Sequence, residues 1–196
     1  MGRLFFKYGA MASGKTLHLL ALAHQLKENG IPYQLIKPKI DNRDGSTIKS
    51  RVGIEQPCSS IGENDSFFEI INKEAKWILI DESQFLKSSQ IDELSFIVDN
   101  SSINIICYGL RTDFLTNLFE GSKRLFEIAD EFNELESYCE CGNKNSVNAR
   151  FNNGKLVTEG EQIEIGGDDK YKSMCRSCYN KLFAQTIDIY EDNNKI

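Results

Sequence analysis

A run of eight residues near the start of the sequence has the spacing of a phosphate-binding loop. It fits the pattern G-x-x-x-x-G-K-[ST] and consists of Gly9, Ala10, Met11, Ala12, Ser13, Gly14, Lys15 and Thr16. The glycines let the backbone wrap around a polyphosphate, and the helix that follows presents its positive end to the same phosphates. Lys15 is expected to reach the β- and γ-phosphates, and Thr16 to bind Mg²⁺. A chance glycine-rich turn is disfavoured because the motif follows an apolar strand and opens a helix.

Two carboxylates, Asp81 and Glu82, directly follow the apolar run Trp77–Ile80. In an open α/β sheet, ligands bind beyond the carboxyl ends of the strands, so both carboxylates are expected near the nucleotide. An Asp at this place helps to hold Mg²⁺, and an adjacent Glu can accept the proton of an attacking hydroxyl. The alternative is that Asp81 caps the next helix and Glu82 is a solvated charge. The phosphate loop upstream favours the catalytic interpretation.

Four of the six cysteines form two pairs late in the sequence. They are Cys139 and Cys141, with C-x-C spacing, and Cys175 and Cys178, with the common C-x-x-C spacing. Four thiolates from two turns predict a structural, tetrahedral Zn²⁺ site with no open position for catalysis. Free thiols and a redox pair are the alternatives, but no strand–CxxC–helix pattern supports a redox pair.

The charge of the chain argues against a general nucleic-acid binder. The net charge is −6, and residues 137–181 carry seven basic and six acidic side chains. A surface that binds a duplex would need a much stronger positive balance. The metal site is therefore expected to brace a loop.

The elements that must position these residues alternate between strands and helices. Strands are predicted at 3–8, 33–38, 77–80 and 103–108, and helices at 15–28, 88–99 and, more weakly, 65–73. The helix at 88–99 is expected to turn Ile91, Leu94, Phe96 and Val98 inward, and residues 39–53 are predicted to be a mobile loop. This alternation predicts an α/β fold with a parallel sheet of the P-loop NTPase type.

The chain changes character near Ser137, where paired cysteines and short β-like segments begin. We therefore predict a P-loop nucleotide-binding α/β domain over residues 1–136, a small zinc-ribbon domain over 137–188, and a flexible tail over 189–196. No apolar run approaches the roughly 18 residues of a membrane helix, and the first residues lack the features of a signal peptide. The expected location is the cytoplasm.

Several stretches together carry a family resemblance. They are Gly9–Thr16, Lys37–Arg43, Asp81–Phe85, Tyr108–Phe114, Gly160–Gln162 and Ile165–Tyr171, ahead of Cys175. In order and spacing they resemble thymidine kinases of the class with a P-loop domain and a zinc-braced lasso, over nearly the whole chain. The C-x-C spacing of the first cysteine pair and Ala10 in the phosphate loop, where many members have proline, depart from the usual family pattern.

The resemblance implies a kinase that transfers the γ-phosphate of ATP to the 5′-hydroxyl of thymidine, with Glu82 as the base. Asp81, Glu82, Ser83 and Gln84 would adjoin the nucleotide and its Mg²⁺, while Asp41 and Arg43 would lie near the transferred phosphate. The implied thymine pocket contains Phe85, Phe114 and Phe119, with Met11 close by. The implied lasso over the base consists of Tyr171 and the backbone of Gln162, Ile163, Glu164, Ile165 and Gly166. The resemblance also implies a homotetramer that thymidine triphosphate inhibits.

Two other functions stay compatible with the sequence. A P-loop ATPase with the ribbon as its DNA-binding module would hydrolyse ATP in response to DNA, and the weak basic charge disfavours it. A non-catalytic nucleotide-binding regulator would not need Glu82. For the three phenylalanines the alternative is plain core packing, which stays open above all for Phe119.

Overall fold

A computed structural model describes residues 1–41, 45–164 and 170–193 of the chain. The chain forms two compact units. The first contains Met1–Tyr8, Gly14–Arg111 and Phe119–Leu135. The second contains Gly9–Ser13, Thr112–Leu118 and, apart from the residues that are not described, Glu136–Ile196. The phosphate loop is thus divided between the units after Ser13.

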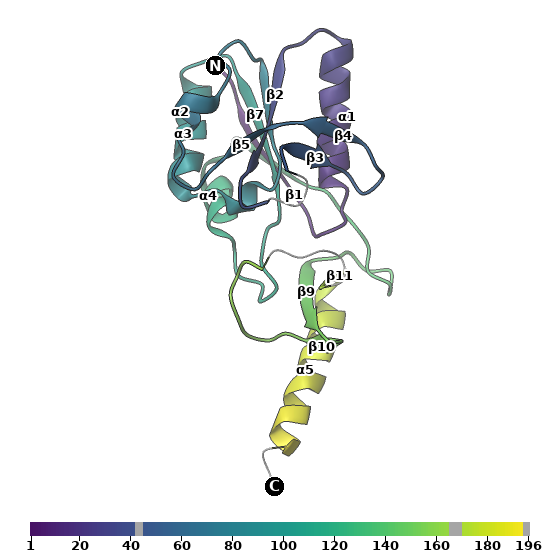
Figure 1. The fold of residues 1–196 in the computed structure, drawn as a ribbon. Helices are drawn as coiled ribbons and strands as arrows, with labels where there is room; N and C mark the ends of the chain where they lie inside the picture. The colour runs from purple at the N-terminus through teal and green to yellow at the C-terminus, as the bar shows by residue number, and fades with distance from the viewer. Residues whose placement is uncertain (42–44, 165–169, 194–196) are drawn as a thin grey trace. The chain divides into compact units, whose positions relative to one another are not determined.

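The first unit is built on a parallel sheet whose six described strands have the order β5-β2-β6-β7-β1-β8 (Figure 1). The strands are β1 (Leu4–Tyr8), β2 (Tyr33–Pro38), β5 (Ser59–Ile61), β6 (Trp77–Ile80), β7 (Asn104–Gly109) and β8 (Glu131–Glu134). The predicted α/β fold with a parallel sheet is confirmed. Because all strands run in one direction, the residues that follow β2, β6 and β7 lie at the same edge of the sheet, where ligands bind in such folds.

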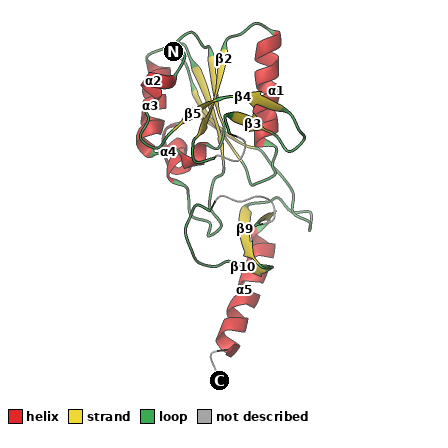
Figure 2. Ribbon diagram, viewed as in Figure 1, coloured by secondary structure: helices red, strands yellow, loops and turns green. Residues whose placement is uncertain are grey.

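Helices cover both faces of this sheet (Figures 1 and 2). They are α1 (Lys15–Glu28) on one face, and α2 (Phe67–Ile70), α3 (Ser88–Asp99) and α4 (Glu120–Ile128) on the other. Successive residues of a strand alternate between the two layers. Ile78 and Ile80 pack in the cluster that includes α3, whereas Leu79 packs in the cluster that includes α1. This alternation explains why β6 is apolar throughout.

Helix α3 differs from its prediction at one residue. Ile91, Leu94 and Val98 are buried as expected, but Phe96 is 58% exposed. The buried residues recur at intervals of three and four, and Phe96 falls outside that stripe. Its ring instead meets the ring of Phe68 edge-on, with 5.7 Å between the centroids.

The segment predicted to be a loop at 39–53 contains a short strand. Strand β3 (Thr47–Lys49) pairs antiparallel with β4 (Glu55–Pro57). Its central residue, Ile48, is 2% exposed and packs in the α1 cluster. One apolar residue among polar ones is too weak a pattern to predict a strand, so the loop prediction was wrong at 47–49. The predicted helix at 65–73 is reduced to the single turn of α2.

The second unit has a much smaller core. Strands β9 (Val147–Asn152), β10 (Lys155–Leu156) and β11 (Tyr171–Met174) form an antiparallel sheet in the order β10-β9-β11, and helix α5 (Arg176–Asn193) follows. The buried apolar residues of this core, among the residues described, are Val147, Ala149, Leu156, Met174 and Tyr179. Helix α5 includes residues 189–193, which the sequence assigned to a flexible tail.

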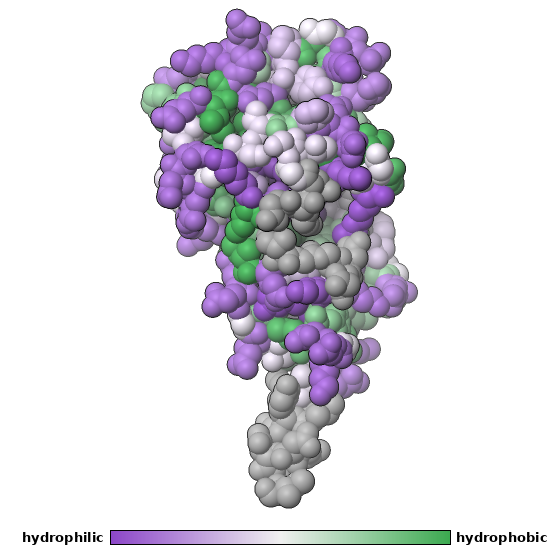
Figure 3. Space-filling view, viewed as in Figure 1, coloured by the Kyte–Doolittle hydropathy of each residue, from purple (hydrophilic) through white to green (hydrophobic). Residues whose placement is uncertain are grey.

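Hydrophilic side chains cover most of the described surface in the view of Figure 3, with smaller apolar areas between them. Within the described part of the chain, no helix combines the length and the apolar character that a membrane span requires.

Candidate active site

The phosphate loop has the backbone conformation that close approach to an anion requires. Gly14 precedes α1 with φ 80°, in the left-handed region that favours glycine. Ala12 also has a positive φ, 61°, which is a strained conformation for a residue with a side chain. The cap of α1 is made without a side-chain hydrogen bond. The positive end of a helix at this place attracts an anion such as a phosphate.

The Lys15 side chain is almost fully enclosed, with 9% of the residue exposed. Burial lowers the pKa of its ammonium to about 8, although the carboxylates of Glu82 and Asp81 act in the opposite direction. Arg51 is close enough to lower this pKa further. A cation held in such a place gains much from an added anion, as the β- and γ-phosphates of a nucleotide would be.

Thr16 and Asp81, the two residues predicted to hold Mg²⁺, are joined by a hydrogen bond. The Thr16 hydroxyl donates a hydrogen bond of 2.9 Å to Oδ2 of Asp81. Burial, and next the charge of Glu82, raise the pKa of Asp81 to about 7. A hydroxyl and a carboxylate are oxygen donors of the kind that Mg²⁺ prefers. The pair therefore fits a divalent cation, whose charge would favour the ionised form of Asp81.

Glu82 is held in an unusual conformation at the end of β6. Its φ of 52° is left-handed, although the residue is not glycine. The Gln84 side-chain amide donates a 2.6 Å hydrogen bond to the Glu82 carboxylate, and its carbonyl accepts one of 3.0 Å from the backbone of Leu110. Gln84 is 2% exposed, so this bridge is shielded from water. The structure thus fixes the position of a carboxylate beside Asp81.

Gly109 makes the bridge sterically feasible. A Cβ at this position would lie 2.8 Å from the Gln84 side-chain oxygen and 2.8 Å from the hydroxyl of Ser83. Both residues belong to the short helix η1 (Ser83–Phe85). The backbone at the end of β7 can therefore approach η1 only because it carries no side chain. Ser83 itself is fully buried, and no described residue is a hydrogen-bond partner of its hydroxyl.

Asp41 lies in a buried ion pair that the sequence did not predict. Its carboxylate is 3.7 Å from the Lys37 ammonium, which also donates a 2.9 Å hydrogen bond to the backbone of Thr47. The side chains are only 2% and 7% exposed. Lys37 and Asp41 are four residues apart in the sequence. This spacing suggests an ion pair on a helix, but residues four apart on an extended strand are not neighbours, so it did not predict this pair. Arg43, the other residue expected near the phosphate, lies outside the described residues.

Two of the expected thymine-pocket residues belong to the first unit and touch each other. The rings of Phe85 and Phe119 meet edge-on, with centroids 5.9 Å apart. Phe119 is 5% exposed, and Phe85 is partly buried. An aromatic pair of this kind can line a site for a flat base, and it can equally be core packing.

In the second unit, the residues of the phosphate loop are attached to the small sheet. The backbone of Met11 donates a 2.7 Å hydrogen bond to the Asn148 side chain, and its carbonyl accepts one of 2.7 Å from the Ser173 hydroxyl. Asn148 lies on β9 and Ser173 on β11. Neither contact could be predicted from a local pattern, because each joins residues more than 130 positions apart.

Side-chain hydrogen bonds hold Gln162 and Tyr171, two other predicted nucleoside-binding residues of the second unit. Phe114 is buried with 1% exposure. The Gln162 side chain donates a 2.9 Å hydrogen bond to Asp113, next to Phe114. The Tyr171 hydroxyl donates one of 3.0 Å to the backbone of Glu164. Ile163 is 41% exposed. Ile165 and Gly166 lie outside the described residues.

The four paired cysteines converge. The sulfurs of Cys139, Cys141, Cys175 and Cys178 all lie within 4.8 Å of one another. Zn–S bonds of about 2.3 Å in a tetrahedron place sulfurs roughly 3.8 Å apart, so the cluster has nearly the required size. A hydrogen bond from the backbone of Asn143 is the main cause that lowers the pKa of Cys141 to about 6, which favours the thiolate that a metal needs. Four cysteines without disulfides thus form a structural zinc-binding site.

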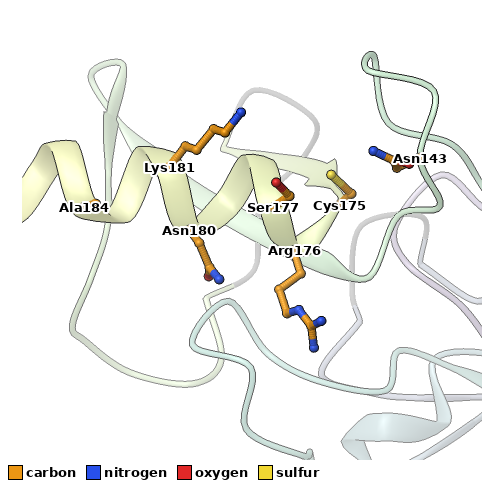
Figure 4. A pocket seen from close by; sticks show the side chains of 7 residues that line it. All are labelled: Asn143, Cys175, Arg176, Ser177, Asn180, Lys181 and Ala184. Atoms are coloured by element: carbon orange, nitrogen blue, oxygen red, sulfur yellow. The ribbon is translucent and has the colours of Figure 1, made fainter.

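A cavity of about 560 Å³ opens beside this cluster. Figure 4 shows its lining residues, which come mostly from the first turns of α5. They are Asn143, Cys175, Arg176, Ser177, Asn180, Lys181 and Ala184. Of the residues that the sequence assigned to a site, only Cys175 lines it, so this cavity belongs to the surroundings of the metal centre.

The fold and these residues define the class of the protein. A parallel sheet, a phosphate loop that opens a helix, and Thr16 bonded to Asp81 are the features of a P-loop nucleoside triphosphate-binding protein. The comparisons with known proteins go further. The family model for thymidine kinase matches residues 2–179. The chain belongs to the thymidine kinase family, and its members are nucleoside phosphotransferases.

Individual relatives agree with the family match. The thymidine kinase of Enterobacteria phage T4 is 43% identical over 189 residues, which cover 93% of this chain and 97% of the relative. Those of Lactobacillus acidophilus and Lactiplantibacillus plantarum are 42% and 41% identical, each over 91% of this chain and 96% of the relative. The family predicted from the sequence is therefore confirmed over nearly the whole chain.

Proposed function

We propose that this chain transfers the γ-phosphate of ATP to the 5′-hydroxyl of thymidine and that Glu82 is the general base. The observation that carries the proposal is the fixed position of Glu82 next to Asp81, whose carboxylate is bonded to Thr16 of the phosphate loop. A base must lie near the phosphate site, because the hydroxyl that it deprotonates attacks the γ-phosphate. The Gln84 side chain orients this carboxylate, and the proposed role requires the 5′-hydroxyl of the nucleoside to approach it.

Phosphate binding is assigned to the loop from Gly9 to Thr16. Lys15 would neutralise charge at the β- and γ-phosphates, which in turn would raise the pKa of its ammonium, lowered to about 8 by burial. Thr16 and Asp81 would hold Mg²⁺, which supplies positive charge to the phosphates when bound. Asp81 to Gln84 would adjoin the nucleotide, with Gln84 acting mainly on Glu82.

The nucleoside would be held by aromatic side chains and by backbone groups. Phe85, Phe114 and Phe119 would pack against the thymine, and Tyr171 and the backbone of residues 162–166 would form the lasso that reads its edge. Asp41 and Arg43 would lie near the transferred phosphate, and Met11 near the base. A flat base suits aromatic faces, and backbone amides and carbonyls distinguish its hydrogen-bonding edge. The buried Lys37–Asp41 pair supports a fixed rather than a freely moving carboxylate at that position.

We further propose a functional division into a P-loop domain over residues 1–136, a zinc-binding lasso domain over 137–188 and a tail over 189–196. Zinc at the four cysteines would be structural and would leave no open position for a substrate. The reduced thiols suit the cytoplasm, which we propose as the location. By family resemblance, we expect a homotetramer inhibited by the end product thymidine triphosphate.

A phosphate-transfer assay tests the proposal directly. Purified protein is incubated with ATP labelled at the γ-phosphate, Mg²⁺ and a panel of nucleosides, with and without DNA. We expect labelled thymidine monophosphate and a lower kcat/KM for deoxycytidine and purine nucleosides. Cytosine has an acceptor where thymine has the N3–H donor, and such a mismatch costs roughly ten- to a hundredfold. ATP hydrolysis that DNA stimulates, without labelled thymidine monophosphate, would refute the kinase assignment.

A further inference from the structure

The start of the predicted lasso is attached to the loop that carries Phe114. Asp113 forms the first attachment, because one of its carboxylate oxygens accepts a 2.9 Å hydrogen bond from the Gln162 side chain. The other oxygen accepts hydrogen bonds of 2.9 Å from the backbones of Leu115 and Asn117. Asp113 is 4% exposed, so water competes little for these bonds. Segment 160–164 and loop 112–118 are thus joined through one buried carboxylate.

Arg150, on β9, makes the second attachment, and neither the sequence nor the proposed function assigns it a role. Its guanidinium lies over the Phe114 ring, with the central carbon 3.6 Å from the ring centroid. The same group donates a 3.0 Å hydrogen bond to the backbone carbonyl of Glu161 and lies 3.3 Å from the Glu164 carboxylate. The residue is only 3% exposed. One side chain therefore contacts both the aromatic residue and the segment predicted to enclose the base.

A glycine makes this contact sterically feasible. Gly160 has φ 129°, which residues with side chains rarely adopt, and a Cβ there would lie 2.9 Å from Nη2 of Arg150. The backbone at the start of segment 160–164 therefore passes directly against the guanidinium. Among the described residues, Nε of Arg150 has no hydrogen-bond partner. The guanidinium is thus held chiefly by Phe114 and by this segment, rather than by its own sheet.

Phe114 is also held from the side of the metal centre. The Tyr179 hydroxyl donates a 3.2 Å hydrogen bond to the Phe114 carbonyl, and Tyr179 follows the zinc ligand Cys178 directly on α5. The Phe114 backbone is thus fixed by α5, whereas its ring is fixed by Arg150. The ring and the segment 160–164 cannot move apart without losing the contacts of the guanidinium.

We propose that Arg150 is a positioning residue for the nucleoside: it holds the Phe114 ring and segment 160–164 in the arrangement that binds thymidine. The inference depends on the proposed function, because it requires that Phe114 and the lasso bind the base. Arg150 need not touch the substrate. Its loss should therefore weaken thymidine binding while phosphate binding, which uses Lys15 and Thr16, persists. A merely structural Arg150 would affect both substrates alike.

The test compares Arg150→Met, which has similar length but neither charge nor donors, with Arg150→Lys and with Lys155→Met. Lys155 is an exposed residue of β10 and serves as the control for the loss of a positive charge in the same sheet. For Arg150→Met we expect the KM for thymidine to rise roughly ten- to a hundredfold, since a charge-assisted hydrogen bond and a cation–π contact are lost together. The KM for ATP should stay within about twofold. The KM of Arg150→Lys for thymidine should lie between those of the wild type and Arg150→Met. An ammonium keeps the charge but cannot reproduce the planar set of donors of a guanidinium.

A second variant reaches the same contact without altering Arg150. Gly160→Ala places a methyl group against the guanidinium and should raise the KM for thymidine by about tenfold, again with little change for ATP. Zinc content and thermal unfolding are measured for each variant. If Arg150→Met loses zinc or does not fold, Gly160→Ala decides the question.

A folded Arg150→Met enzyme with a near-normal KM for thymidine, or with both KM values raised equally, would overturn the inference. An unchanged KM for thymidine in Gly160→Ala, when Arg150→Met does not fold, would overturn it as well. Failure of the wild-type protein to phosphorylate thymidine would instead refute the proposed function.

Discussion

The two compact units of the chain differ in the size of their apolar cores. In the first, apolar side chains cover both faces of the sheet, among them Phe6 and Ile78 on one face and Leu79 and Ile106 on the other. In the second, the apolar core is small, and charged or polar groups such as Asp113, Asn148 and Arg150 are buried beside it. A small core contributes little stability, so such units commonly depend on metals or on specific polar contacts.

This difference indicates how each unit should respond to a single substitution. The first unit holds its reactive carboxylates on a rigid sheet, so a single substitution there should change the chemistry but not the fold. The second unit is held by four cysteines and a set of polar contacts, so a single substitution there should change the structure of a binding segment. Variants in each unit should therefore affect different kinetic constants.

Removing the proposed base should have the largest effect. Glu82→Gln keeps the shape but not the ability to accept a proton, so kcat should fall by roughly 10²–10⁴-fold. The KM for thymidine and the zinc content should remain near those of the wild type, because the side chains proposed to hold the thymine and the four paired cysteines are unchanged. Steady-state kinetics checks this, with the exposed Glu69→Gln as the control. Near-normal turnover in Glu82→Gln would show that another group takes the proton.

Breaking the metal site should come next. Purified protein is expected to contain about one Zn²⁺ per chain. Cys141→Ser should lower that content and raise the KM for thymidine by at least about tenfold, with a smaller change for ATP. Elemental analysis and kinetics measure both, and Cys58→Ser makes the same change outside the cluster. Fully active protein without zinc would contradict the dependence of the second unit on metal.

The Gln84 bridge allows a finer test of the first unit. Gln84→Met removes the amide that donates to Glu82 and accepts from Leu110. We expect kcat to fall by about tenfold, since the carboxylate loses one orienting hydrogen bond. The KM for ATP should change little, and Gln25→Met on the exposed face of α1 serves as the control. A raised KM for ATP with normal kcat would instead make Gln84 a nucleotide-binding residue.

The smallest expected effect concerns stability and pH. Burial raises the pKa of Asp81 from 3.8 to about 7, so its ionised form is disfavoured in the folded protein. Asp81 therefore lowers the free energy of unfolding. This destabilisation is absent at low pH, grows as the pH rises from about 4 to 7, and is complete above that range. In the absence of Mg²⁺, Asp81→Asn should therefore be more stable than wild type at pH 8 by about 1–3 kcal/mol, and not at pH 4. Thermal unfolding at both values checks this, with exposed Asp99→Asn as the control.

The sequence predicted the features whose residues are close together along the chain. The phosphate loop, Asp81 with Glu82, and each cysteine pair are local patterns with a known chemical meaning. The parallel sheet was predicted from the largely apolar runs at β1, β2, β6 and β7, because strands buried on both faces are rich in apolar residues. The two cysteine pairs could be combined because four thiolates have one common structural use.

The contacts between distant segments could not be predicted in this way. Gln84 meets Leu110 because β6 and β7 are neighbours with a particular register, and Arg150 meets Phe114 because β9 passes the loop 112–118. A local sequence pattern determines neither the register of two paired strands nor the path of a loop. Phe96 and Ile48 show the same limit on a smaller scale: one was predicted buried and is exposed, and the other lay in a predicted loop and is buried.

The enclosed ammonium of Lys15 should also have a chemical reactivity unlike that of other lysines. Because the pKa of Lys15 is about 8, its side chain is the neutral amine in roughly half of the molecules at pH 8. An exposed lysine is almost entirely protonated at that pH. Only the neutral amine attacks electrophiles, so a small amine-directed reagent, or a nucleotide that carries one, should modify Lys15 ahead of the surface lysines. Bound phosphates would restore its proton and cover it. Labelling of this one lysine, suppressed by ATP, would then report occupancy of the phosphate loop without any measurement of turnover.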